Sequence, residues 1–231
     1  MLFLLKTYYM AQIEKSFNDC TLVYLEKTFG LRQVSNALDL TEWQSLASKI
    51  TLSDFEKAEI NIYQEQLIDN ILHWNEQELS IHFIGPILSL ARFTSPERRF
   101  NIFAERLISA TVENLANETI QLSGKPDGLI ATGYREPESP FFCFTEYKKY
   151  REPSGEPEGQ CLSSLLAGQA LNHPSEKAMY GCFVIGRDWY FMTLLGKEYC
   201  ISQDFSSATD DVLKIATMLK ALKEIIIELT A

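Results

Sequence analysis

Two short segments in the middle of the chain carry residues that could do chemistry together. Asp127 follows a proline and opens the apolar run 128–131, and a second run of β type, 141–145, leads directly into Glu146 and Lys148. Side chains alternate along a strand, so Glu146 and Lys148 point to the same face. If the two runs pair, Asp127 approaches that face as well. Two carboxylates and an amine at one sheet edge are costly unless a cation and a reaction justify them.

The side-chain types at this sheet edge indicate which metal ions could bind there. Carboxylate oxygens are hard ligands that favour Mg²⁺ or Mn²⁺ over zinc. The five cysteines are dispersed, with no C-x-x-C pair and no histidine at metal-ligand spacing, which argues against structural zinc and a disulfide framework. A divalent cation beside an amine suits phosphodiester hydrolysis, because it relieves charge repulsion and acidifies a bound water. The simplest alternative is that Lys148 only forms a salt bridge with Glu146.

The bulk composition is that of a globular protein. The chain has 231 residues, of which 46% are hydrophobic and 23% charged, and no apolar run approaches the ~18 residues that span a bilayer. Lys6 ends the apolar run 1–5 before a secretory segment forms, so we expect a cytoplasmic protein with no membrane partner.

The net charge of −10 opposes phosphate binding, so cations or a local basic patch must compensate for it. Each basic residue that could form such a patch can equally be a solvated surface charge. These residues are Arg92, Arg98, Arg99, Lys125, Lys148, Lys149 and Arg151.

Helical patterns dominate the first third of the chain. Residues 8–29 form one amphipathic stretch that ends at Gly30, a natural residue for helix termination. The segments 41–44 and 53–56 both match the capping box, and the second predicts a helix that runs to about Trp74. We therefore expect residues 1–74 to be an N-terminal helical extension packed on an α/β domain formed by residues 75–231.

A further helix is expected to begin near Asn75 and Glu76. At 100° per residue Glu76 shares a direction with apolar residues such as Phe83 and Ile87, whereas Glu78 falls on the opposite side. A carboxylate on the apolar face is unusual and makes Glu76 a candidate site residue. Its structural alternative is a role in capping the helix N-terminus. Pro86 is expected to kink or restart this helix.

Strand patterns and helices alternate in the remainder. Strands are predicted at 107–113, 118–122, 127–132, 141–148, 179–185, 189–194 and 198–201, and helices at 157–172 and 210–229. This order predicts an α/β fold with a central sheet covered by helices on its faces.

This order and these motifs resemble the PD-(D/E)xK nuclease superfamily, which has the restriction-endonuclease-like fold. The family core runs helix, three strands, helix, strand, with Pro-Asp on the second strand and Glu-x-Lys on the third. Here Pro126 and Asp127 lie 19 positions before the Glu-x-Lys motif at 146–148. The run 75–88 looks like the first core helix in the nuclease domain of type I restriction motor subunits. The resemblance covers residues 75–202 and implies a central mixed sheet flanked by helices.

The resemblance also implies roles for individual residues. Asp127 and Glu146 would hold Mg²⁺ or Mn²⁺, together with the backbone carbonyl of Tyr147, and Glu76 would be an outer or second-metal ligand. Lys148 would assist the attacking water. Gln160 stands where several members carry a glutamine on the second core helix, although Ser164 replaces the tyrosine that often follows four residues later. A polar residue of the first helical turn is the alternative interpretation of Gln160.

Three functional hypotheses remain open on the sequence. The leading one is a metal-dependent nuclease, with DNA favoured over RNA as its substrate and RNA left open. A homodimer is also left open. The second is a catalytically inactive member of the same fold that binds nucleic acid or protein. The third is a structural or interaction protein in which Glu146 and Lys148 form only an ion pair.

Overall fold

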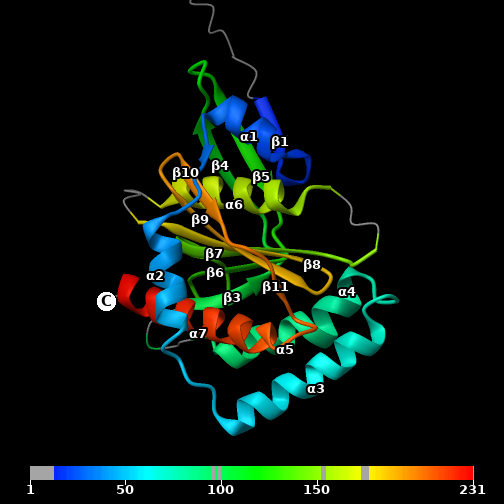
Figure 1. Ribbon diagram of the computed structural model, residues 1–231. Helices are drawn as coiled ribbons and strands as arrows, with labels where there is room; N and C mark the ends of the chain where they lie inside the picture. The colour runs from blue at the N-terminus through cyan, green and yellow to red at the C-terminus, as the bar shows by residue number, and fades with distance from the viewer. Residues whose placement is uncertain (1–12, 95–96, 98–99, 152–154, 173–176, 231) are drawn as a thin grey trace, which may run out of the picture.

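The computed structural model describes residues 13–94, 97, 100–151, 155–172 and 177–230. Two sheets and their covering helices build an α/β architecture, as the sequence predicts (Figure 1). Within the described ranges, the helices include none that is both long and apolar enough to cross a bilayer.

The main sheet is mixed and runs in the order β2–β10–β9–β8–β7–β6–β3, with the short β11 also paired to β9. Its strands are β2 (Arg32–Gln33), β3 (Phe100–Ala104), β6 (Gly128–Thr132), β7 (Glu138–Lys148), β8 (Met179–Ile185), β9 (Asp188–Leu195), β10 (Glu198–Ile201) and β11 (Phe205–Ser206). Strands β3, β6 and β7 pair antiparallel, whereas β7 and β8 are parallel neighbours. The connection between β7 and β8 therefore has to cross a face of the sheet, and a helix makes this crossing.

A second sheet contains β1 (Ile13–Ser16), β5 (Thr119–Gly124) and β4 (Ile108–Glu113), in the order β1–β5–β4. The predicted strands at 107–113 and 118–122 therefore exist, but they form a separate hairpin. On the edge of β6 away from β7, the partner strand is β3, which was not predicted from the sequence. Hydrophobic periodicity identifies a strand but not the sheet that accepts it.

The N-terminal region differs from the single helix predicted at 8–29. Residues 13–16 form a strand parallel to β5, and a helix, α1, spans only Leu22–Phe29; residues 8–12 lie outside the described ranges. A 3-10 turn, η1 (Phe17–Asp19), lies between them. Gly30 ends α1 in the left-handed conformation, with φ of 72°, as expected. Strand β2 extends the main sheet, so the predicted extension contributes strands as well as helices.

The other helices are α2 (Leu38–Ala47), α3 (Asp54–Asn70), α4 (Glu76–Leu79), α5 (Gly85–Ala91), α6 (Pro157–Leu171) and α7 (Asp211–Leu229). The capping box of Ser53 and Glu56 at the start of α3 is confirmed. The one predicted at 41–44 is wrong, because α2 begins earlier and the Thr41 hydroxyl donates to the carbonyl of Ala37, 3.0 Å away.

Pro86 restarts the helix that begins at Glu76, as predicted. A π-helical turn, η2 (Ser80–Ile84), separates α4 from α5, and Pro86 lies in the first turn of α5. Proline has no N–H to donate to the preceding turn, so a change of helical geometry at this point is expected.

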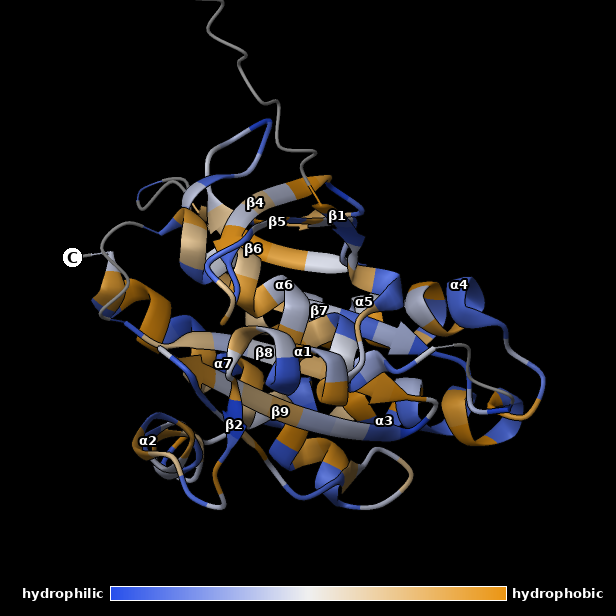
Figure 2. Cartoon of the chain, turned by 90° about the horizontal axis from the view of Figure 1, so that it is seen from above, coloured by the Kyte–Doolittle hydropathy of each residue, from blue (hydrophilic) through white to orange (hydrophobic). Residues whose placement is uncertain are grey.

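Helices cover both faces of the main sheet. Helix α6 packs on β7 and β8, and Gly168 permits the close approach, since a Cβ there would lie 2.4 Å from the Phe144 ring. The opposite face is covered by α2, α5 and α7 around a core that includes Trp43 and Phe191. Figure 2 shows largely hydrophobic strands between these layers, in contrast to the hydrophilic outer helix α4.

Trp43 joins the N-terminal region to the main core. Its ring contacts Tyr180 and Phe191 edge-on at centroid distances of 5.3 and 5.1 Å, and its Nε1 donates to the Met218 carbonyl at 2.7 Å. We expect Trp43→Ala to lower the free energy of unfolding by about 3–5 kcal/mol in a single transition, measured by urea denaturation. Phe55→Ala, on the 70% exposed ring of α3, is the control and should change it by less than about 0.5 kcal/mol. A separate early transition for residues 13–74 would contradict this prediction.

Candidate functional site

The pairing of β6 with β7 places the two predicted motifs together. Gly128 is opposite Thr145, so one step further along the antiparallel ladder Asp127 falls opposite Glu146. Directly opposed residues in such a ladder have Cβ atoms about 4.5–5.5 Å apart. The predicted pairing of the two runs is therefore confirmed.

Gly128 makes the close approach of these strands possible. A Cβ at this position would lie 2.5 Å from the Thr145 hydroxyl and 3.2 Å from the Tyr147 hydroxyl. Those two hydroxyls bond each other at 2.8 Å on the face of β7 that lies away from Glu146. A side chain at 128 would push the strands apart at the point where Asp127 meets β7, so the glycine fixes the position of the carboxylate.

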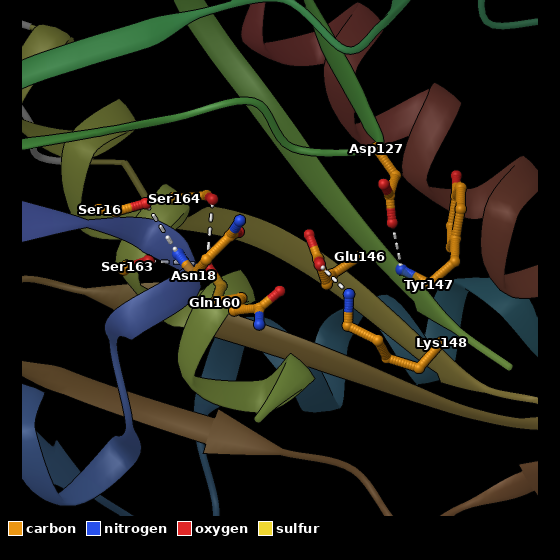
Figure 3. Close-up of polar contacts among 9 residues, drawn as sticks. All are labelled: Ser16, Asn18, Asp127, Glu146, Tyr147, Lys148, Gln160, Ser163 and Ser164. Carbon is orange, nitrogen blue, oxygen red and sulfur yellow. Dashed lines mark hydrogen bonds and ion pairs between the residues drawn. The ribbon is translucent and has the colours of Figure 1, made fainter. Parts of the chain in front are cut away.

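Glu146 and Lys148 form a nearly buried ion pair. Lys148 Nζ lies 2.8 Å from Glu146 Oε1, and the two side chains are only 9% and 8% exposed. In Figure 3 both extend from the side of β7 opposite to the Tyr147 ring. The contact required by the salt-bridge alternative is thus present, and the remaining question is what other groups surround it.

Asp127 is half-buried and is oriented by backbone groups. Its Oδ2 accepts a hydrogen bond of 2.6 Å from the amide of Tyr147, as Figure 3 shows, and its carbonyl accepts one of 3.3 Å from the amide of Glu105. These bonds hold the carboxylate at the end of β6, beside the strand that carries Glu146 and Lys148. Only part of its hydrogen-bonding capacity is used by them.

The cluster carries more negative than positive charge. Burial, followed by the charge of Asp127, raises the pKa of Glu146 to about 7, although Lys148 opposes the shift. Burial also raises the pKa of Asp127, with contributions from Glu76 and Glu105. Burial alone would lower the pKa of Lys148, but its hydrogen bond to Glu146 and the charges of Glu146, Glu76 and Asp127 raise it. A protein built this way has a reason to bind a cation here.

Glu76 contributes its charge to this cluster and does not cap α4. Asn75 and Glu78 make the capping box, with bonds of 2.9 Å from the Glu78 amide to Asn75 and 2.8 Å from the Asn75 amide to Glu78. The capping alternative for Glu76 is therefore wrong. The half-buried Glu76 instead raises the pKa values of Asp127, Glu146 and Lys148 from a helix distant in sequence.

Gln160 has a free acceptor atom beside the same cluster. It is 4% exposed, and its Oε1 has no hydrogen-bond partner in the described part of the chain. Figure 3 shows its amide on the side of β7 where Glu146 and Lys148 project, and Glu146 also acts electrostatically on the next residue, Cys161. Ser164, at the position of the family tyrosine, donates to the Gln160 carbonyl at 3.0 Å.

The donor set fits a hard cation in chemistry, although it is not a preformed cage. Among the described residues no three histidine, cysteine, aspartate or glutamate side chains are grouped so as to hold a metal ion. Glu76 is therefore not positioned as a third direct ligand. Asp127 and Glu146 supply oxygen atoms, and the unpartnered Gln160 Oε1 could accept from a water bound to an ion. One or two carboxylates with several waters are the usual set for Mg²⁺.

Two features near the site were not found from the sequence. Strand β3 brings Glu105, with φ of 50°, to the backbone of Asp127, and α5 ends at Arg92, beside a cavity that Asp127 also lines. The apolar run 100–104, interrupted by Asn101, was the available signal for β3. Of the basic residues considered above, Arg98 and Arg99 lie outside the described ranges.

Comparison with known proteins adds no assignment. No protein-family model matches the chain, and a search of the curated proteins finds no match. The functional argument therefore depends on the residues and geometry described above.

The raised pKa of Glu146 predicts a pH-dependent stability in the metal-free protein. The pKa of Glu146 is about 7 in the folded protein, whereas the ordinary pKa of a glutamate is 4.5. Between these two pH values the folded state therefore binds more protons than the unfolded state. The free energy of unfolding contributed by this group should fall as pH rises through that window, by up to about 3 kcal/mol.

Glu146→Gln removes this titration. Urea unfolding in EDTA between pH 4.5 and 8 should show the variant gaining stability relative to the natural chain as pH rises. Parallel stability profiles for the two proteins would contradict the assignment of the raised pKa to Glu146.

Proposed function

We propose that the protein hydrolyses phosphodiester bonds of nucleic acid with the help of Mg²⁺ or Mn²⁺. The observation that carries the proposal is the junction of β6 and β7, where Asp127 falls opposite Glu146 and Lys148 pairs with that glutamate. The carboxylates of Asp127, Glu146 and Glu76 act on this junction against the ammonium of Lys148, and Glu105 adds its charge at Asp127. A divalent cation would offset the negative charge that is left in excess.

The order of elements supports the same proposal. The hairpin of β4 and β5 belongs to the second sheet and can be treated as an insertion between β3 and β6. Without it, the order is α5, β3, β6, β7, α6 and β8, which is compatible with the helix, three strands, helix, strand of the restriction-endonuclease-like core. Asp127 precedes the second of these strands and Lys148 ends the third, as in the family pattern.

Each residue has a role in the proposed reaction. Asp127 and Glu146 would hold the ion, whose chemistry when bound would be to acidify a water and to offset charge on the phosphate. Glu76 adds negative potential that favours the ion from outside its immediate ligands. Gln160 accepts a hydrogen bond from a water at the site through its free Oε1. Because no three of the described acidic, histidine or cysteine side chains form a cage, waters complete the coordination.

Lys148 acts through its positive charge. In the metal-free protein the carboxylates around it raise its pKa, which favours the ammonium form over a general base. Its ammonium instead orients the attacking water and stabilises the phosphate oxygens as negative charge develops. The resemblance favours DNA as the substrate over RNA, and a homodimer stays a prediction.

A cleavage assay tests the proposal directly. Single-stranded and duplex DNA and RNA are incubated with the full chain and Mg²⁺ or Mn²⁺, and the products are resolved by length. Lys148→Met keeps the buried volume but removes the ammonium, so cleavage should fall by at least about 10²-fold. Lys197→Met, an exposed lysine between β9 and β10, is the matched control and should cleave normally. Normal cleavage by Lys148→Met would show that Lys148 has no catalytic role.

The catalytically inactive binding module is the second candidate. It is favoured by the burial of the Glu146–Lys148 pair, which leaves little of either side chain open to a substrate. The same buried pair would be found if Glu146 and Lys148 served only to stabilise the fold, which is the third hypothesis.

Calorimetry separates the alternatives from the proposed enzyme. The natural chain should bind Mn²⁺ with measurable heat, and Asp127→Asn, which keeps the hydrogen bond to Tyr147 but removes the charge, should lose most of it. Glu105→Gln, which removes a nearby charge that is not a proposed ligand, is the control and should bind nearly as well. Absence of heat with the natural chain would favour the inactive or structural interpretation.

A further inference from the structure

A cavity of about 590 Å³ lies next to Asp127, between α5 and the edge of the main sheet formed by β3 and β6. This volume is within the range of about 300–1,000 Å³ common for small-molecule sites. The exposed side chain of Ile102 lines it together with Ser89 and Thr94. The cavity therefore offers both an apolar surface and hydrogen-bonding groups beside the proposed catalytic carboxylate.

Arg92 is the one basic residue among the described residues that line this cavity. It is exposed, and its guanidinium makes no ion pair or hydrogen bond with another residue in the described part of the chain. The chain as a whole has a net charge of −10, so an arginine without a carboxylate partner beside a cavity stands out. A guanidinium of this kind is well suited to a phosphate, which it can bind through two parallel hydrogen bonds.

The backbone of Arg92 supports a role in binding. It ends α5 with φ of 55° and ψ of 56°, in the left-handed region that glycine usually occupies at this position. A non-glycine residue in this conformation costs conformational free energy. No ion pair or side-chain hydrogen bond of Arg92 with another described residue offsets that cost. Such an outlier is a reason to look for a function of the side chain.

A larger neighbouring cavity is a poor phosphate site by comparison. Arg92 also borders a space of about 1,090 Å³ between α3, α5 and α7, where Glu56, Glu59 and Glu224 stand against Lys220 and Lys223, and Lys220 already pairs with Glu56. Among the described residues that line the smaller cavity, Asp127 is the one acidic residue, and it is the proposed ligand of the cation. A cation on Asp127 would leave the smaller cavity with a positive balance, whereas the carboxylates of the larger space would stay exposed to a phosphate. The proposed cation therefore favours a phosphate in the cavity that adjoins the catalytic cluster.

We propose that this cavity holds an unpaired nucleotide next to the phosphate that is cut, with the Arg92 guanidinium on the phosphate of that nucleotide. The inference rests on the proposed nuclease function and names its substrate as a single-stranded region. One arginine matches one phosphate, whereas tight binding of a duplex commonly involves several phosphate contacts. The apolar walls suit an exposed base or sugar, which a paired strand does not present.

The test measures binding and its salt dependence. Fluorescence anisotropy compares a labelled single strand with the blunt duplex of the same sequence in the presence of Mn²⁺, in a Lys148→Met background that does not cut. The single strand should bind more tightly than the duplex. Arg92→Gly should weaken single-strand binding by about tenfold or more. It should also reduce the slope of log K against log salt by about 0.7, the value for one phosphate contact on a single strand.

Matched variants separate charge from backbone strain. Arg92→Lys keeps the charge and should retain the salt slope. Asn117 is another left-handed residue, with φ of 58°, in the turn between β4 and β5. Asn117→Gly relieves its backbone strain and should not change binding. Lys197→Gly removes an exposed charge at the opposite end of the main sheet and should have little effect. The melting temperature of Arg92→Gly should not fall, because glycine accepts the left-handed conformation.

The outcomes distinguish this inference from the proposed function. Unchanged affinity and salt slope in Arg92→Gly would overturn the phosphate site, even if the natural chain cleaves nucleic acid with Mg²⁺. Tighter binding of the duplex would overturn the single-stranded substrate. Arg92-dependent binding without cleavage by the natural chain would reject hydrolysis and keep the binding site. Absence of both binding and cleavage would reject both.

Discussion

The antiparallel pairing of β6 with β7 is the constraint on which the candidate site depends. It puts Asp127 opposite Glu146, and the missing side chain at Gly128 lets the two strands approach. Once the strands are in this register, alternation sends Glu146 and Lys148 to one face and Tyr147 to the other. A shift of one residue would separate the carboxylates and turn the lysine into the opposite core.

The electrostatic consequence of this pairing is an excess of negative charge in a poorly solvated place. Lys148 compensates part of it, yet the pKa of Glu146 still rises to about 7, because burial and Asp127 outweigh the ammonium. Stability alone gives little reason to retain such an arrangement, since a buried ion pair is often no better than apolar residues of the same size. Binding of a cation would resolve the excess and gives the cluster a purpose.

The main sheet separates two environments that meet at the end of β7. On the α6 face lie the ion pair and the side-chain Oε1 of Gln160, which has no hydrogen-bond partner among the described residues; both are largely buried. On the α5 face lies the open cavity that Asp127 shares with Arg92. Asp127 sits between them, bonded to the amide of Tyr147. Asp127 therefore lies between the proposed ion-binding cluster and the cavity proposed to hold a nucleotide.

The sequence by itself determined the elements and motifs whose signals are local. Alternation in 141–148, the Pro-Asp start of β6 and the capping box of Ser53 all depend on near neighbours, and the structure agrees with each. The capping box of Asn75 and Glu78 is as local as that of Ser53, so the sequence could have excluded Glu76 as the cap of α4. Only the tertiary structure decided which sheet accepted 108–113 and that 13–16 became a strand. Burial of the ion pair, the free Gln160 oxygen and the cavity of Arg92 likewise arise from packing between distant segments, because desolvation and strand pairing depend on contacts that no local pattern encodes.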